Sequence, residues 1–130
     1  MKLSELVVDT KTVWVPFDGV PGFEVELNYI PRTEMTRLIK DCQVSKLNRK
    51  TRQVEMELDE EKFLKRFVDK AINDWKGLNS SNVGEFLPVD STENEVEIEF
   101  SQESAILLVK ESQEFDDWIN SKITEIDTFR

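Results

Sequence analysis

The stretch from Leu58 to Leu78, LDEEKFLKRFVDKAINDWKGL, constrains the fold of this chain more than any other. Its apolar residues fall in pairs every four positions, which places them on one side of an α-helix. Asp59 is positioned to cap the first turn, and Gly77 to end the helix in a left-handed conformation. The pattern predicts one core helix, whose buried side would contain Phe63, Leu64, Phe67, Val68, Ala71, Ile72 and Trp75.

Two β-strands are expected before this helix. Thr12–Pro16 has the composition of a short strand, and Phe23–Tyr29 alternates apolar residues with Glu24, Glu26 and Asn28. Turn-forming pairs, Asp-Gly and Pro-Gly, separate the two segments. We therefore expect an N-terminal β-hairpin.

The segment between the hairpin and the core helix is expected to contain a helix, a loop and a strand. Pro31 ends the second strand, and a helix is expected from Thr33 to about Cys42. Gln43–Arg52, which carries four cations, is predicted to be a flexible surface loop, with a basic docking loop as the alternative. Val54–Leu58 alternates and predicts a strand. The inner side of the helix would contain Met35, Leu38, Ile39 and Cys42.

The second half of the chain is expected to begin with an irregular stretch after Leu78, to which Phe86, Leu87 and Val89 would add core contacts. Glu95–Phe100 then alternates like a strand. Ser101 can cap a short apolar helix, and Ser112 is expected to begin a last one. The apolar stripe of that last helix contains Phe115, Trp118, Ile119, Ile123 and Ile126, with Phe129 near its end.

These elements predict an α+β fold in a single domain over residues 1–130. A small, mainly antiparallel sheet would include the N-terminal hairpin, and about four helices would pack on it. No internal repeat or second domain is visible in the sequence.

The charge is distributed unevenly. Residues 1–52 carry a net charge of +2 and residues 53–130 a net charge of −12, for a total of −10. Because phosphate contacts need clustered positive charge, no nucleic acid is expected as a partner. No apolar run approaches the roughly 20 residues of a membrane span, and no secretory signal is recognisable. With one cysteine, Cys42, expected to be a core residue, the chain is predicted to act in the cytoplasm.

Several classes of chemistry lack their residues in this chain. The sequence contains no histidine, which removes histidine-based nucleophilic sites and zinc sites. It has no phosphate-binding glycine loop and no pair of cysteines. Asp116 and Asp117 are adjacent on a predicted helix and point in different directions, which disfavours a cation site. We expect no enzymatic activity, no catalytic residue, no metal and no cofactor.

The order of motifs resembles that of the tail assembly chaperones of long-tailed, siphovirus-type bacteriophages. The resemblance extends from about Val13 to Ile119. It rests on VWVPFDGVPGFEVELNYIPR, NRKTRQ, the core-helix stretch ending in DWKGL, IEFSQESAILLV and EFDDWI. The resemblance implies a binding protein that keeps the tape measure protein soluble until tail tube subunits polymerise around it.

The same resemblance implies further partners. Besides the tape measure protein, they are the tail tube protein and a longer, frameshifted form of the chain itself. A homo-oligomer also fits this role. The chain, which ends at Arg130, would correspond to the shorter product. The protein is expected in the host cytoplasm and not in the mature virion.

Two sets of apolar residues are candidates for binding the partner, with core packing as the alternative for both. An amphipathic client helix could lie between helices of the domain. Two other functions remain open: an acidic interaction protein such as a DNA mimic, and a structural tail connector or completion protein. The candidate residues are Trp14, Phe17 and Phe23 in the hairpin, and Phe115, Trp118, Ile119 and Ile123 in the last helix.

Overall fold

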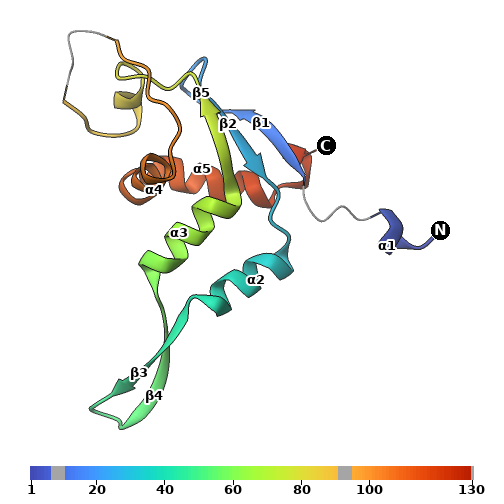
Figure 1. The fold of residues 1–130 in the computed structure, drawn as a ribbon, viewed down its shortest axis with the longest axis vertical. Helices are drawn as coiled ribbons and strands as arrows, with labels where there is room; N and C mark the ends of the chain where they lie inside the picture. The colour runs from blue at the N-terminus through green and yellow to red at the C-terminus, as the bar shows by residue number, and fades with distance from the viewer. Residues whose placement is uncertain (7–10, 91–94, 130) are drawn as a thin grey trace.

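The computed structural model describes residues 1–6, 11–90 and 95–129 of the chain. Within these residues the fold is α+β, with a three-stranded sheet, a separate two-stranded ribbon and five α-helices (Figure 1). No helix of the described part is long and apolar enough to cross a membrane. The strands are β1 (Thr12–Pro16), β2 (Glu24–Asn28), β3 (Gln43–Asn48), β4 (Gln53–Leu58) and β5 (Ile72–Lys76). The helices are α1 (Leu3–Leu6), α2 (Arg32–Asp41), α3 (Glu60–Ala71), α4 (Gln102–Glu111) and α5 (Gln113–Thr124), with 3-10 turns η1 (Val83–Glu85) and η2 (Ile126–Phe129).

The three-stranded sheet has the order β1-β2-β5, and both pairings are antiparallel. This confirms the predicted N-terminal hairpin. Val15 pairs with Val25 and Val25 with Trp75, so these three side chains lie on the same face of the sheet. All three are buried, which makes this the inner face.

The core helix is shorter than the apolar spacing predicts. Asp59 caps α3 as expected, its carboxylate accepting a hydrogen bond from the Lys62 amide at 3.1 Å. The helix ends at Ala71, however, and Ile72 and Trp75 belong to β5. A register shift in the β2–β5 pairing lets both side chains lie on the inner face three positions apart. Helix spacing and bulged-strand spacing therefore coincide here.

Side-chain amides stabilise the direct transition from α3 to β5. Asn28 Nδ2 donates to the Lys70 carbonyl at 2.8 Å, which satisfies a backbone acceptor in the last turn of α3. The same Nδ2 lies 2.8 Å from Asn73 Oδ1, and Asn73 Nδ2 donates to Asn28 Oδ1 at 2.9 Å. The end of the helix is thus bound to the neighbouring strand.

An aromatic cluster fills the space between the inner face of the sheet and α5. Phe17 lies in the β1–β2 connection, and its ring centroid is 5.0 Å from those of both Phe86 and Trp118. Phe23 stacks on Phe86 at 5.8 Å and on Phe115 at 6.3 Å. All five residues are buried, so segments distant in the sequence meet in one core.

The helix α2 and the segment that follows it differ in part from expectation. α2 has the predicted position, and Leu38 and Cys42 are buried, but Ile39 is exposed. Gln43–Arg52 is not a flexible loop, because most of it forms β3 and its turn. β3 pairs antiparallel with β4 over six residue pairs, and the ribbon extends away from the rest of the domain (Figure 1).

The second half of the chain follows the predicted helices more closely than the predicted strand. Ser101 and Ser112 accept hydrogen bonds from the amides of Ser104 and Phe115, so both cap helices as expected. Glu95–Phe100 is not a strand, since a single bridge, Asn79 to Glu97, is all the pairing it has among the described residues. The side chain of Ile126 lies outside the part of the chain that the structure describes.

The first testable prediction concerns Gly77, which has a φ of +81°. A Cβ at this position would lie 1.8 Å from the Gly22 carbonyl oxygen, a backbone atom. We expect Gly77→Ala to destabilise the fold by more than the roughly 1–2 kcal/mol that a left-handed conformation alone costs. Gly19→Ala is the matched control, because Gly19 has a φ of +86° and open space around its Cβ position. Urea unfolding measures both, and equal losses would contradict the close approach.

The second prediction concerns Trp118, which is 8% exposed and whose Nε1 has no hydrogen-bond partner among the described residues. Trp118→Ala should lower the free energy of unfolding by about 3–5 kcal/mol, as aromatic truncations in a core do. Trp118→Phe keeps most of the packing and removes the unpartnered N–H, so its loss should be clearly smaller. Thermal unfolding followed by circular dichroism checks both. A Trp118→Ala variant as stable as the wild type would place this residue outside the core.

Candidate binding surfaces

Most of the residues predicted to bind a partner lie inside the domain. Phe17 and Trp118 are 4% and 8% exposed, and the other buried members of the predicted set are fully buried. The structure brings Phe17 and Phe23 of the hairpin set together with Phe115 and Trp118 of the last-helix set in one aromatic cluster, where they pack against one another. Their binding of a partner stays a prediction. The buried candidates are Phe17, Phe23, Phe115, Trp118, Ile119 and Ile123.

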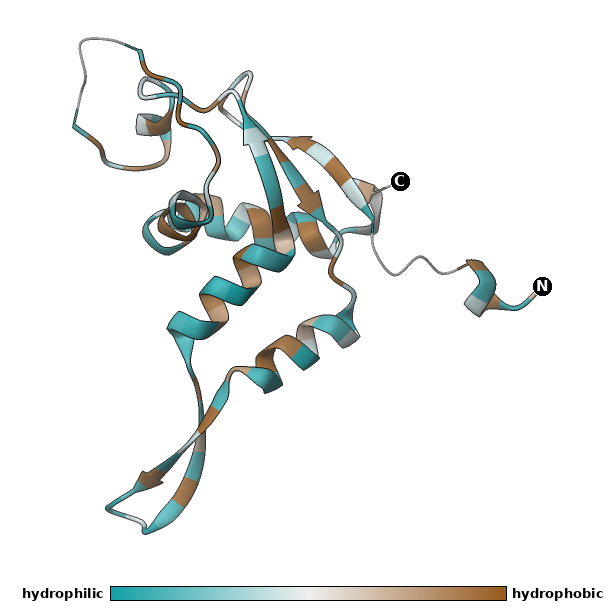
Figure 2. Ribbon diagram, in the orientation of Figure 1, coloured by the Kyte–Doolittle hydropathy of each residue, from teal (hydrophilic) through white to brown (hydrophobic). Residues whose placement is uncertain are grey.

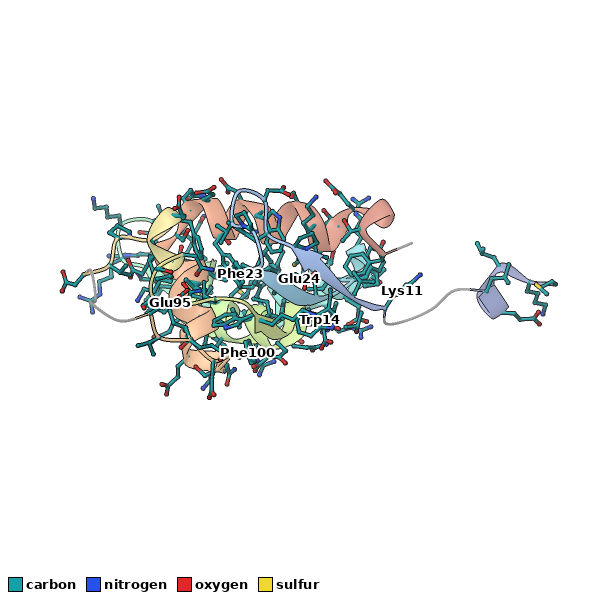
Figure 3. The ribbon with its side chains drawn as sticks, turned by 90° about the horizontal axis from the view of Figure 1, so that it is seen from above. Lys11, Trp14, Phe23, Glu24, Glu95 and Phe100 are labelled. Carbon is teal, nitrogen blue, oxygen red and sulfur yellow. The ribbon has the colours of Figure 1, made fainter. Side chains whose placement is uncertain are left out.

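Trp14 is the exposed member of the predicted set, at 38%. It lies on the outer face of the sheet, where it pairs with Glu26 of β2. The Lys76 ammonium lies 4.6 Å from the centroid of its ring and also 3.2 Å from a Glu24 carboxylate oxygen. The ring is thus covered in part by a cation. Figure 3 shows Trp14 and Glu24 near each other, seen from above.

Helices α3 and α4 form an open groove, here called the interhelix groove, with a volume of about 630 Å³. Its apolar residues are Leu64 of α3 and Ile106 of α4, which are half-buried and pack against the core. Asp69 of α3 accepts a hydrogen bond from Gln102 of α4, which joins the two helices. The remaining residues that line the groove are charged: Glu60, Glu61, Lys65, Glu103 and Lys110.

A second depression, here called the loop hollow, lies between α4 and the irregular segments before it. Its volume is about 180 Å³ and nearly all of its lining is apolar. Leu107, which contributes to it, is 52% exposed although it is a large aliphatic residue. The lining residues are Trp75, Leu78, Val83, Leu87, Val89, Ile98, Ser104, Leu107 and Leu108.

The sequence around the loop hollow is strongly acidic. Residues 77–109 contain seven Asp or Glu and no Lys or Arg. Glu97 is held by its bridge to Asn79, and the Glu95 carboxylate accepts a hydrogen bond from the Ser81 hydroxyl at 3.2 Å. The hollow therefore offers apolar surface beside a segment of uniform negative charge, which favours a partner with apolar and basic groups.

The ribbon of β3 and β4, residues 43–58, is here called the arm. Its strand residues are exposed apart from Asn48, which is half-buried. Figure 2 shows hydrophobic residues on both strands, and the exposed ones include Leu47 at 61%, Val54 at 68% and Met56 at 60%. The arm carries four Lys or Arg and two Glu, a net charge of +2 in a chain of net charge −10.

Charged groups also join α2 to α3. Lys70 Nζ lies 2.8 Å from a Glu34 carboxylate oxygen, and Arg37 lies 3.2 Å from the other oxygen. The hydrogen bond and charge of Lys70 hold the pKa of Glu34 below its ordinary value. Both ion pairs lie at the surface, where such pairs contribute little to stability. Of the two, the Lys70–Glu34 pair joins α2 to α3, while the Arg37–Glu34 pair lies within α2.

In the adjacent pair Asp116 and Asp117, the pKa of Asp116 shifts in the opposite direction to that of Glu34. Burial, and then the charge of Asp117, raise the pKa of Asp116 above its ordinary value, while a hydrogen bond from Asn120 opposes this rise. Among the described residues there is no group of three or more Cys, Asp or Glu that could hold a metal ion.

Sequence patterns indicated two of the three candidate surfaces, the arm and the interhelix groove. The alternation of Val54, Met56 and Leu58 predicted a strand correctly, but alternation does not tell whether the apolar side meets the same chain or another molecule. The groove between helices was expected in general terms, without its residues. The loop hollow was missed because its lining comes from α4 and β5 as well as from irregular segments, whose arrangement has no period in sequence.

Comparison with known families gives one match. The sequence model of the YdaY prophage protein matches residues 31–130, which include α2 to α5, the arm, the interhelix groove and the loop hollow. No curated protein and no solved structure matches the chain. The match indicates a phage-derived protein. Because it covers more than half of the sequence, the chain belongs to the YdaY prophage protein family.

Proposed function

We propose that this prophage protein is a tail assembly chaperone. It would bind the tape measure protein and keep it soluble until tail tube subunits polymerise around it. The resemblance of the sequence motifs to such chaperones and the family's phage origin support this proposal. The observation that carries it in the structure is the interhelix groove between α3 and α4.

The groove has the form needed to receive an amphipathic helix. A helix docks with residues at positions i, i+3, i+4 and i+7 in an apolar depression. Leu64 and Ile106 form such a floor between two helices, and about 630 Å³ of open space lies above it. A tape measure protein is long and largely helical in phages of this kind, so it offers many segments with an apolar side.

The charges around the groove favour binding that is reversible and oriented. Three glutamates and two lysines line it. Such exposed charges contribute little to affinity but set the orientation of the bound helix and disfavour unsuitable partners. A chaperone that later gives up its client to tail tube subunits needs this combination of modest affinity and rapid exchange.

The proposal is for a binding protein and not an enzyme. It requires no cofactor, and the absence of histidine from the sequence supports it. The partners would be the tape measure protein, the tail tube protein and a longer frameshifted form of the chain, in the host cytoplasm. The finished virion would not contain the protein.

The third prediction tests client binding by co-expression with tape measure fragments from the same prophage. A fragment that precipitates alone should stay soluble with the wild-type protein. Ile106→Gln should reduce the soluble fraction several-fold, because it places a polar side chain on the apolar floor of the groove. The matched control is Leu107→Gln, since the neighbouring Leu107 lines the loop hollow and not the groove.

The outcomes of this test separate the proposal from its alternatives. Circular dichroism first establishes that both variants are folded. Unchanged solubility of several fragments with the wild-type protein would contradict the chaperone function. Mass spectrometry of purified virions gives an independent check, because a tail connector or completion protein would be found in them and a chaperone would not.

A further inference from the structure

The apolar side of the arm is uncovered. Residues directly opposite in an antiparallel ribbon point to the same side, so Leu47 lies beside Val54, and Met56 and Leu58 follow along the same face. The other face is polar apart from Val44, with Lys46 Nζ 3.6 Å from Glu57 and Asn48 bonded to Glu55 at 3.0 Å. A two-stranded ribbon is marginally stable in water without a layer against its apolar face.

The tip of the arm is well defined and positively charged. Asn48 Oδ1 accepts hydrogen bonds from the Lys50 amide at 2.9 Å and the Thr51 amide at 3.3 Å, and the Arg52 amide donates to the Asn48 carbonyl at 2.7 Å. These bonds fix the turn. Within residues 1–6, 11–90 and 95–129, no ion pair involves the side chains of Arg49, Lys50 or Arg52. The tip thus presents three cations next to an apolar face.

The loop hollow has the opposite character. It is apolar and includes the half-exposed Leu107. Two of its lining residues have acids as direct neighbours in the sequence: Asp90 follows Val89, and Glu97 and Glu99 flank Ile98. Val89 and Val96 in the same region are 46% and 57% exposed. An apolar ligand with positive charges at one end would satisfy both features of this surface.

The arm and the loop hollow are therefore complementary, but they belong to different ends of the molecule. The arm extends from the C-terminus of α2 and the N-terminus of α3. The segment around η1, which contributes to the hollow, lies at the opposite end of the domain (Figure 1). Hydrogen bonding between the Asp59 amide and the Cys42 carbonyl, at 2.7 Å, closes the base of the arm. An arm held in this way does not reach the hollow of its own chain.

We infer that the arm binds the loop hollow of a second copy of this chain. Leu47, Val54 and Met56 would pack in the hollow and on Leu107. Arg49 and Lys50 would face the acids next to its lining residues, Asp90, Glu97 and Glu99. The contact is heterologous, because each copy uses two different surfaces. Such contacts build closed rings or open chains, or a two-fold dimer when two copies exchange arms.

This inference is independent of the proposed function. The interhelix groove, which would bind the client, uses Leu64 and Ile106, and neither residue belongs to the arm or the loop hollow. Self-association and client binding can accordingly be tested by different variants of the same full-length chain.

The fourth prediction is that two variants, each defective alone, pair with each other. The arm variant combines Val54→Gln and Met56→Gln, and the hollow variant is Leu107→Gln. Sedimentation velocity should show the wild type as an oligomer that dissociates as salt is raised. Each variant alone should associate at least about tenfold more weakly, because buried apolar contacts are lost. An equimolar mixture should form a one-to-one dimer, since one arm and one hollow remain intact.

Matched controls exclude a general effect of the substitutions. Val44→Gln changes the opposite face of the arm, and Ile106→Gln changes the residue next to Leu107 on α4; both should associate like the wild type. Thermal unfolding verifies that every variant is folded.

Four outcomes would overturn the inference. The first is a wild-type chain that remains monomeric at the highest attainable concentration. The second is an oligomer that neither variant weakens. The third is a mixture that fails to pair, which would indicate contact between two arms or two hollows. The fourth is an arm that binds duplex DNA or RNA in a gel-shift assay and leaves self-association unchanged when mutated.

Discussion

The burial of Phe23 and its neighbours between the sheet and α5 is the interaction on which the rest of the structure depends. Phe23 is fully buried. Its ring contacts those of Trp75 in β5, Phe86 directly after η1 and Phe115 in α5. Each of these segments is short and would not be stable alone. Aromatic side chains bury large areas and also prefer tilted or offset contacts, so one cluster of them both stabilises the domain and orients its parts. The candidate surfaces are positioned by elements anchored to this cluster.

Sequence patterns predicted the elements whose hydrogen bonds and buried faces are local. The β1–β2 hairpin, the cap of α3 by Asp59 and the caps at Ser101 and Ser112 all follow from residues close in sequence. The predicted end of α3 was wrong, because Ile72 and Trp75 have a spacing that fits a helix and a bulged strand equally well. What decides between them is pairing with β2, more than 40 residues earlier, and no local rule contains that information.

The same distinction explains the candidate surfaces. The partner-binding residues predicted from aromatic content are mainly core residues in the structure, because periodicity detects a buried face whether it is buried within one chain or between two. The arm presents the reverse case. Its β4 strand alternates like a core strand, yet its side chains are exposed. Distinguishing these cases needs the arrangement of the whole chain, and the charge pattern then indicates what each surface can meet.

The closed base of the arm has a consequence for how this family can vary. The backbone leaves the domain at Cys42 and returns at Asp59, with the two residues hydrogen-bonded across the gap. The arm between these two residues can therefore differ in length without altering the geometry of α2 and α3. Such a segment can be shortened, extended or replaced by a foreign peptide at little cost to the remaining fold. Folding alone would therefore constrain the length of this segment little, and a graft at this point offers a way to display new sequences on the same scaffold.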